Sequence, residues 1–523
     1  MGEVILTGSG GGSSKAGLPP SICKNMTIRI SGTSVYLKWY DPQNTVIDKQ
    51  YLCTWGGTKI VKKLGSYPKN ENDGTLVVDN KIMGQYSATP YEDTIESGED
   101  WKYAAFPYST NGVYCYNDRN RFTEAIIYEY TINYNGDSNP STKVAYPVGS
   151  LNENYNPAYM DYNSVAFNYG DWENAFFMPR PVMVKSDGTV DYELYKTDFR
   201  YKADGITASD YNNASYDGNV MIAFPQIWTK VEQDGTLLHR YIANKQVDEN
   251  YKCYTHINRL GVLQDEIFVN AFQPCNISSK LRSIAGQTIM VSQSATTERT
   301  YAQANGQCWD MMDFGVWRMI EMLLVLMSKS MDTQTKFGFG RGTTANATTG
   351  ELADKPMFYA TSGTSNCGIK VFGIENLYGN YWKRILGAIG SANCIKYKLC
   401  DYTSDGSTVI NYNLDGTGYK TTNAISGGST GAGGSGYYAH RYGNADSYQL
   451  NEDGLFPLTL NGSSSTNDCD INYIPTDSGA GVAIVGGSYG SGAGGGAFAL
   501  NLYNTASYAG AGIGGSLSCK PLS

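Results

Sequence analysis

Apolar and polar positions alternate most regularly near the end of the sequence. Phe498, Leu500 and Leu502 are separated by smaller or polar residues, and this period of two predicts a short strand with one buried face. The intervening positions should face solvent: Ala497, Ala499, Asn501 and Tyr503. Further apolar positions that we expect to anchor the segment in a core are Val482, Ile484, Ile513 and Leu517. A poorly ordered Gly-rich tail is the weaker interpretation, because such tails lack a buried alternating stripe.

The same patterning predicts a strand-rich block at residues 22–122. Short β-prone runs are separated there by turn signals such as Asn72-Asp73-Gly74 and Ser97-Gly98, a spacing typical of a small β-sandwich. The predicted strands cover residues 26–30, 34–41, 49–55, 58–64, 74–80 and 100–108. In front of them, residues 1–21 have the Gly/Ser-rich composition of a flexible linker.

Residues 123–523 contain no clean linker, and we interpret them as one large domain with long insertions. The turns at Asp187-Gly188 and Asp234-Gly235 predict β-hairpins. Apolar residues at three- and four-residue steps predict a buried helix within residues 309–332: Trp317, Ile320, Leu323, Leu324 and Met327. The fold class expected for the whole chain is therefore α+β and rich in β-strands.

A second Gly-rich stretch, residues 426–448, allows two interpretations. A flexible insertion is the default for such a composition. The alternative is a loop that flanks a binding face, since it contains residues suited to contacts: Tyr437, Tyr438, Arg441 and Tyr442.

Composition narrows the class of partner. The chain of 523 residues has a formal net charge of −9, which argues against nucleic acid and anionic membrane surfaces as partners. It contains 42 tyrosines and 60 glycines but only 17% charged residues, a balance that suits long ordered loops and polar recognition surfaces.

Cysteines and apolar runs bear on the compartment. The 11 cysteines are odd in number and irregularly spaced, which predicts free, partly buried thiols formed in a reducing cytoplasm. The first residues do not have the pattern of a secretory signal. The most apolar run, residues 319–327, contains Glu321 and is too short to span a bilayer, so we expect no membrane insertion.

The end of the chain resembles the variable C-terminus of phage and bacterial proteins with a C-type-lectin fold that are diversified by retroelements. The matching positions are Gly486-Gly487-Ser488-Tyr489, Gly492, Gly496, Phe498, Leu500-Asn501-Leu502, Asn504, Ala506-Ser507 and Ile513-Gly514. Two positions depart from the family pattern: Tyr489 replaces the usual Trp, and Ser516 replaces the usual Arg. The resemblance implies that residues 481–523 form a variable binding segment.

Tyr, Ser, Gly and Asn are also enriched in antibody binding loops, in which Tyr supplies rigid contact area. The expected ligand-binding residues are Tyr489, Gly490, Ser491, Ala493, Gly494, Ala497, Ala499, Tyr503, Tyr508, Gly510 and Ala511. Tyr503 and Tyr508 are the strongest hot-spot candidates, and we expect their truncation to weaken binding while leaving the fold intact.

Two further runs resemble known families. Residues 37–42 (LKWYDP) and 101–108 (WKYAAFPY) resemble strands of a fibronectin type III domain, with Trp39 pointing inward. Residues 373–383 (GIENLYGNYWK) resemble a signature of the formylglycine-generating-enzyme branch of the C-type-lectin fold, although Lys383 replaces the usual acidic residue. We expect Glu375 and Asn376 to satisfy buried backbone groups and Trp382 to fill the core.

Patterns that would indicate catalysis or cofactor binding are missing from the sequence. The three histidines, His239, His256 and His440, lack metal-ligand spacing, and there is no P-loop, dinucleotide fingerprint or G-x-S-x-G motif. Calcium-lectin motifs are also missing, and nothing marks Cys394 and Cys400 as a reactive pair. We therefore expect no enzyme activity, metal or cofactor.

The leading hypothesis is a phage tail-tip or fibre receptor-binding protein, made in the host cytoplasm and carried on the virion. Its partners would be a bacterial cell-surface protein or glycan and other phage tail proteins, and a homotrimer would let several weak sites act together. The alternatives are a bacterial or prophage-encoded variable surface-binding protein and, less favoured, a formylglycine-generating-type oxidase.

Overall fold

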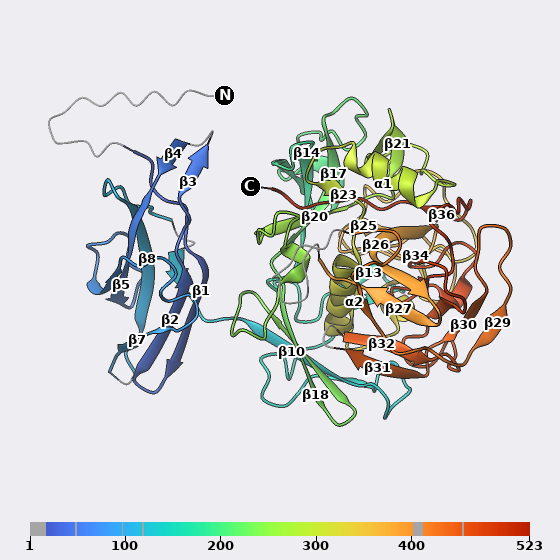
Figure 1. The fold of residues 1–523 in the computed structure, drawn as a ribbon, viewed down its shortest axis with the longest axis horizontal. Coiled ribbons are helices and arrows are strands. Elements are labelled where there is room, and N and C mark those ends of the chain that lie inside the picture. The colour runs from blue at the N-terminus through green and yellow to red at the C-terminus, as the bar shows by residue number, and fades with distance from the viewer. Residues whose placement is uncertain are drawn as a thin grey trace. The chain divides into compact units, whose positions relative to one another are not determined.

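The computed structural model describes residues 17–47, 50–96, 98–117, 120–400, 412–451 and 454–522. Within these ranges the protein is rich in β-strands, as predicted. The chain divides into a small unit, residues 1–126 with 245–249, and a large unit, residues 127–244 with 250–523 (Figure 1). Most of the linker predicted at residues 1–21 lies outside the described residues, as does Ser97 of one predicted turn.

The small unit contains two sheets that share one core. The first has the order β1 (Lys24–Ser31), β2 (Ser34–Tyr40) and β7 (Tyr91–Thr94). The second has the order β6 (Thr75–Asn80), β5 (Trp55–Leu64), β8 (Trp101–Ser109) and β9 (Arg121–Phe122), and a separate ribbon pairs β3 (Thr45–Ile47) with β4 (Gln50–Cys53). Trp39, Ile60 and Tyr103 are fully buried between the two sheets, so the inward orientation predicted for Trp39 is confirmed.

Two sheets of the large unit are built mainly from antiparallel neighbours. One has the order β11 (Val144–Ala145), β10 (Ile127–Asn133), β19 (Leu237–Ala243) and β18 (Trp228–Asp234). The other has the order β16 (Asp198–Lys202), β15 (Val190–Tyr195), β14 (Arg180–Lys185), β17 (Gly218–Pro225), β20 (Glu266–Asn270), β37 (Ser518–Cys519) and β23 (Trp309–Asp310). Both predicted hairpins are confirmed, and Gly188 and Gly235 take the positive φ that their turns require.

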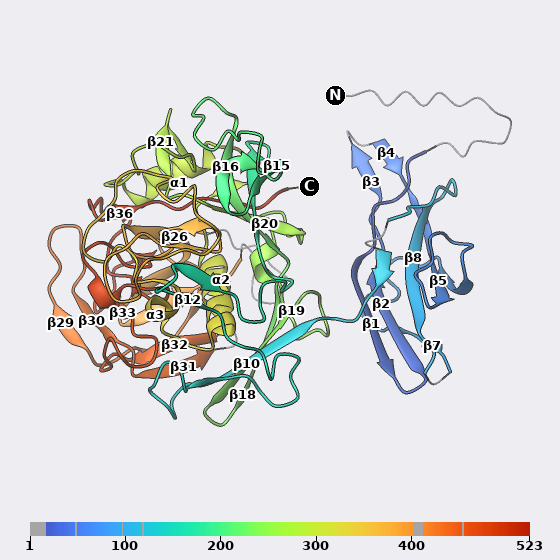
Figure 2. The same cartoon turned by 180° about the vertical axis from the view of Figure 1, so that it is seen from behind.

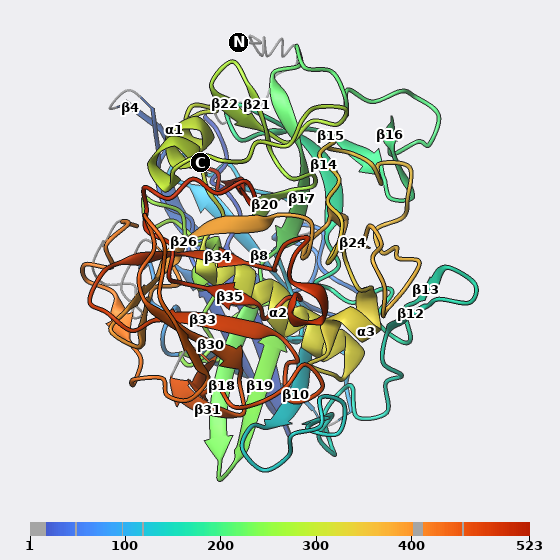
Figure 3. The same cartoon turned by 90° about the vertical axis from the view of Figure 1, so that its right-hand side faces the viewer.

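The central sheet of the large unit carries the end of the chain. Its strands follow in the order β28 (Lys420–Thr421), β27 (Cys394–Tyr397), β26 (Trp382–Ser391), β34 (Gly481–Val485), β35 (Leu500–Asn501), β33 (Ile471–Pro475), β30 (His440–Asn444) and β29 (Ser429–Gly431). The strand β36 (Ile513–Gly514) also pairs with β26, in parallel. Figure 3 shows β26, β34, β35, β33 and β30 side by side.

The helix predicted within residues 309–332 forms at its centre. The helix α2 (Phe314–Ser328) begins after Asp313, whose side chain accepts from Val316 N, and ends at Lys329 in the left-handed conformation. All five apolar residues that predicted this helix are buried, and the helix lies in the interior of the large unit (Figure 2). The other α-helices of the described residues are α1 (Ala295–Gln303) and α3 (Thr333–Phe337).

Short ribbons complete the large unit. They pair β12 (Tyr159–Asp161) with β13 (Ala166–Asn168), β21 (Cys275–Ile277) with β22 (Lys280–Arg282), β24 (Lys370–Val371) with β25 (Ile374–Glu375), and β31 (Ser447–Asn451) with β32 (Gly454–Thr459). All 11 cysteines are free and are buried or half-buried, as the sequence predicted.

Candidate functional site

The C-terminal segment is ordered because it returns to the central sheet three times. β34 pairs with β26, and β35 lies between β34 and β33. β36 pairs in parallel with the first two residues of β26. Two loops connect these strands, which we name loop one (residues 486–499) and loop two (residues 502–512). Each loop therefore leaves and re-enters the same rigid sheet, an arrangement that suits a binding surface.

The structure corrects the predicted faces of this segment. Ala497 and Ala499 are fully buried and Asn501 is nearly so, whereas we expected all three to face solvent. The reason is that β35 lies inside the sheet and is covered on both faces. Trp317 of α2 donates to Ala497 O at 2.9 Å, and Ala499 packs in a cluster with Trp382. Positions 497 and 499 hold small residues because Trp317 and Trp382 leave little space beside them.

The apolar frame agrees better with the prediction. Leu500 and Leu502 are buried, while Phe498 is only half-buried. The four further anchors proposed from the sequence are all buried: Val482, Ile484, Ile513 and Leu517.

The candidate binding residues fall into three groups by exposure. Those that face solvent are Tyr489, Gly490, Ala493 and Ala511. Those that are half-buried are Ser491, Gly494, Tyr503 and Tyr508. Ala497, Ala499 and Gly510 are buried and cannot touch a ligand in this conformation. Gly510 lies beneath the ring of Tyr508, where an added Cβ would stand 2.7 Å from a ring carbon.

A buried carboxyl group fixes the end of loop one. Asp470 Oδ2 accepts from Phe498 N at 2.7 Å. A Cβ on Gly496 would lie 2.4 Å from Asp470 Oδ1, so a larger residue here would displace that buried carboxyl group. Burial, together with the nearby Asp468, raises the pKa of Asp470 well above its usual range.

A buried ion pair fixes loop two. Arg384 of β26 donates to Glu298 Oε2 of α1 at 2.9 Å and, through Nη2, to Tyr508 O at 2.9 Å. Both side chains are almost completely buried, and burial raises the pKa of Glu298 to about 7, against the opposing effect of Arg384. The backbone of Tyr508 is thus held while its ring stays partly accessible.

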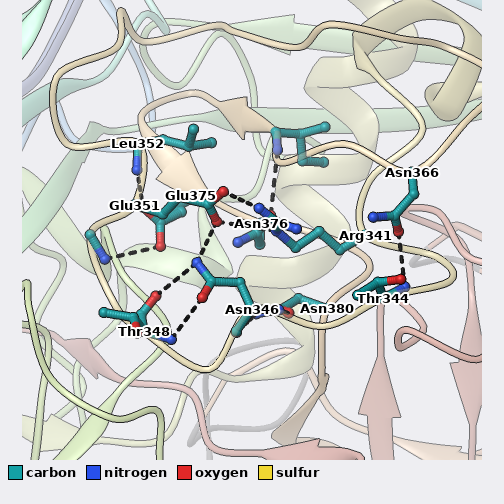
Figure 4. A network of polar contacts seen from close by, with 12 residues as sticks. Arg341, Thr344, Asn346, Thr348, Glu351, Leu352, Asn366, Glu375, Asn376 and Asn380 are labelled. Carbon is teal, nitrogen blue, oxygen red and sulfur yellow. Dashed lines mark hydrogen bonds and ion pairs between the residues drawn. The ribbon is translucent and has the colours of Figure 1, made fainter.

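A polar network in residues 341–380 supports the start of loop one (Figure 4). Asn346 Nδ2 donates to Glu351 Oε2 at 2.6 Å, and Arg341 forms an ion pair with the same carboxylate. Asn346 N donates to Asn380 Oδ1 at 2.8 Å, and Asn380 O accepts from Tyr489 N at 2.8 Å. Through these contacts the network fixes the backbone of Tyr489. Sequence reasoning missed it, because its members are dispersed over forty residues without a motif.

The run 373–383 has the structural roles that we predicted. Glu375 accepts from Gly350 N at 3.0 Å and from Leu352 N at 2.7 Å, and Asn376 Oδ1 accepts from Ile369 N at 3.4 Å (Figure 4). Burial raises the pKa of Glu375 to about 7. Trp382 is buried against Ile484 and Ile513, as expected for a core residue.

The second Gly-rich stretch is an ordered hairpin rather than a flexible insertion. Its strands β29 and β30 extend the central sheet next to β33. The tip of the hairpin also touches loop two, because Tyr437 forms a β-bridge with Asn504 and Thr505 Oγ1 donates to Gly436 O at 2.9 Å. The two Gly-rich stretches therefore form one continuous surface.

The four residues of that hairpin that the sequence proposed as ligand contacts differ in exposure and in their partners. Tyr442 is exposed and Tyr437 is half-buried. Arg441 donates to Asn393 Oδ1 and Gly427 O, so its side chain is engaged within the fold. Tyr438 is half-buried, and its ring lies against Gly479.

Tyr437 and Tyr442 belong to a run of neighbouring rings, the aromatic ladder, that crosses from the hairpin to loop two. Neighbouring ring centroids are 4.0–5.9 Å apart. Its members are Tyr437, His440, Tyr442, Tyr473, Tyr503 and Tyr508.

No protein-family model matches the chain, and no curated protein is significantly similar to it in sequence. Within the described ranges, no helix has the length and apolarity needed to cross a membrane. Over the same part of the chain, no group of three or more His, Cys, Asp or Glu side chains is arranged to hold a metal ion.

Proposed function

We propose that this protein is a receptor-binding protein of a phage tail tip or fibre, with loops one and two as its adhesion surface. The observation that carries the proposal is that, within residues 481–519, different residues hold the backbone and face solvent. Buried strands and polar anchors hold the backbone, while Tyr489, Ala493 and Ala511 project from it. Such a surface can change its side chains without changing its frame.

We further propose the two fold families that the sequence resembles. The arrangement of three and four strands around Trp39 in the described small unit supports a fibronectin type III-like domain that acts as a spacer. The large unit would be a C-type-lectin-fold domain with long insertions. Two observations support this: Glu375 and Trp382 serve the core, and β26 lies beside β34 and β36.

In this proposal the protein resides on the virion, contacts other tail proteins, and binds a cell-surface protein or glycan of the host. Several copies, for instance a homotrimer, would raise the avidity of individually weak sites. A bacterial or prophage-encoded variable surface protein is the alternative. The neighbouring DNA distinguishes the two, because phage tail genes on both sides would favour the virion protein. A repeat matching the codons of residues 481–515, next to a reverse transcriptase gene, would support diversification in either case.

The proposal is tested by adsorption of the purified chain to candidate host cells. We expect Tyr489→Ala and Ala511→Glu to reduce adsorption, because both side chains project from the loops. Tyr159→Ala is the matched control, since Tyr159 is similarly exposed but lies on β12. If the loop variants adsorb as well as the parent, these loops are not the adhesion surface.

A further inference from the structure

The aromatic ladder contains two stacked pairs of rings. The rings of His440 and Tyr503 stack with centroids 4.1 Å apart and an interplanar angle of 15°. Tyr442 and Tyr473 stack at 5.7 Å and 26°. Tyr473 lies 5.8 Å from Tyr503 at an interplanar angle of 48°, so the two stacked pairs are neighbours that are tilted against each other. Each of these rings is half-buried or exposed, which leaves part of the ladder open to solvent.

Sheet register explains why His440, Tyr442 and Tyr473 gather on one face of the sheet. On β30, His440 and Tyr442 are two residues apart and therefore point to the same face. Tyr442 is directly opposite Tyr473 of β33 in the antiparallel register. Arg441, between the two aromatic residues of β30, points to the other face and donates to Asn393.

Several glycines of the hairpin lie so close to the rings that a larger side chain would clash with them. An added Cβ on Gly431 would stand 3.0 Å from the ring of His440. A Cβ on Gly433 would stand 2.5 Å from Tyr437 Cβ, and one on Gly436 3.4 Å from the ring of Tyr508. The Gly-rich composition of the hairpin therefore allows the backbone to pack closely against the rings.

The ladder is also uncharged. Burial lowers the pKa of His440 below its usual value, so its imidazole is neutral at neutral pH. Among the described residues, none of the Lys and Arg side chains that stand over an aromatic ring does so over a member of the ladder. The complementary ligand is accordingly neutral as well.

We propose that the aromatic ladder binds a neutral glycan, with the C–H face of a pyranose ring packed on Tyr442 and Tyr473. This inference rests on the proposed adhesion function and names the ligand class. A pyranose offers an apolar face and a rim of hydroxyl groups, which matches rings that carry an apolar body and a phenol tip. Tyrosines also serve protein interfaces, so a protein receptor is the competing outcome that the test below must separate.

The test measures binding of the full-length chain to immobilised neutral oligosaccharides of glucose, galactose, mannose and N-acetylglucosamine, with hyaluronate as an acidic comparison. We expect at least one neutral glycan to bind, without strong salt dependence. Tyr442→Ala should weaken that binding by about tenfold or more, since losing one stacking ring removes a hot-spot contact. Tyr442→Phe keeps the ring and should retain binding. Tyr195→Ala, a similarly exposed tyrosine on β15, is the matched control.

Three results would overturn the inference: no neutral glycan binds, hyaluronate alone binds, or Tyr442→Ala binds like the parent. Adsorption to host cells separates this failure from failure of the adhesion proposal. Adsorption that is lost after protease treatment of the cells but survives periodate oxidation of their glycans would indicate a protein receptor, leaving adhesion standing and the glycan inference wrong. Loss of adhesion itself is judged from the loop variants Tyr489→Ala and Ala511→Glu.

Discussion

At the scale of single residues, identical residue types in the C-terminal segment have different roles. Gly490 lies at the exposed tip of loop one, where an added Cβ would meet nothing within 4 Å. Gly496 lies against the buried carboxylate of Asp470, where a Cβ would stand 2.4 Å from an oxygen. Ala511 is exposed and Ala499 fully buried. Composition alone cannot separate the positions that tolerate change from those that hold the frame.

We predict that Gly496→Ala destabilises the protein by more than about 2 kcal/mol, because the new methyl group must displace either Asp470 or the backbone that it anchors. Gly490→Ala should change stability by no more than about 0.5 kcal/mol. Chemical denaturation of both variants checks this. Equal stabilities would mean that Asp470 does not fix the loop.

The tyrosines of the two loops should also differ in their effects. Tyr489 is exposed, and its ring touches mainly Tyr381, so Tyr489→Ala should reduce adhesion with a stability change within about 0.5 kcal/mol. Tyr503 is half-buried in the aromatic ladder, so Tyr503→Ala should also cost about 1–2 kcal/mol of stability. This revises the expectation from the sequence that truncating Tyr503 leaves the fold intact. Melting curves paired with adsorption assays measure both effects, and a Tyr503→Ala variant as stable as the parent would contradict the packing described.

At the scale of elements, β26 begins within the run 373–383 and pairs with both β34 and β36 of the C-terminal segment. Its first residue, Trp382, packs on Ile484 of β34 and Ile513 of β36. We predict that Trp382→Ala costs about 3–5 kcal/mol, as for other buried tryptophans. Denaturant unfolding measures it, and an unchanged midpoint would show that β26 and β36 are not held through this ring.

At this scale, part of the fold could be predicted from the sequence and part could not. Most strands of the small unit, the two hairpins and the core of α2 follow directly from period and turn signals and are confirmed, whereas the short strands β3, β7 and β9 were not predicted. The faces around Ala497 and Ala499 could not be predicted, because a two-residue strand inside a sheet has no solvent side. The anchors Asp470 and Arg384 were also missed, since their partners are 28 and 124 residues away in sequence.

At the scale of the whole molecule, several ionisable groups are buried. Burial raises the pKa of Glu298 and Glu321 to about 7 and that of Asp468 to about 6. Burial lowers the pKa of Lys143 to about 8. Each of these shifts makes folding depend on pH, because the unfolded chain binds its protons with ordinary affinity.

We predict that stability falls as the pH rises from about 5 to 7, because over this window the folded protein holds protons on these buried acids, and on Glu375 and Asp470, that the unfolded chain has released. Buried His256, whose pKa is lowered to about 3, acts in the opposite sense but is a single group against five acids. Lys143 acts in the opposite sense above about pH 8, where the folded protein has lost a proton that the unfolded chain still binds. The melting temperature should therefore be higher near pH 5 than near pH 7. Asp468→Asn should flatten the slope, and a melting temperature that instead rises from pH 5 to 7 would contradict this account.

The position of β37 has a consequence for synthesis. This strand pairs with β20 and β23, and β34, β35 and β36 fill the central sheet, so the two sheets are completed only by residues 481–519. A ribosome must therefore translate beyond Gly514 before the central sheet can close and beyond Cys519 before the other sheet can close. A chain interrupted by a premature stop codon in the Gly-rich loops would leave β20, β26 and β33 with open edges, and such products are prone to aggregation or proteolysis. Completion of both sheets is thus coupled to translation through loops one and two, so a chain that stops within either loop cannot complete the fold described here.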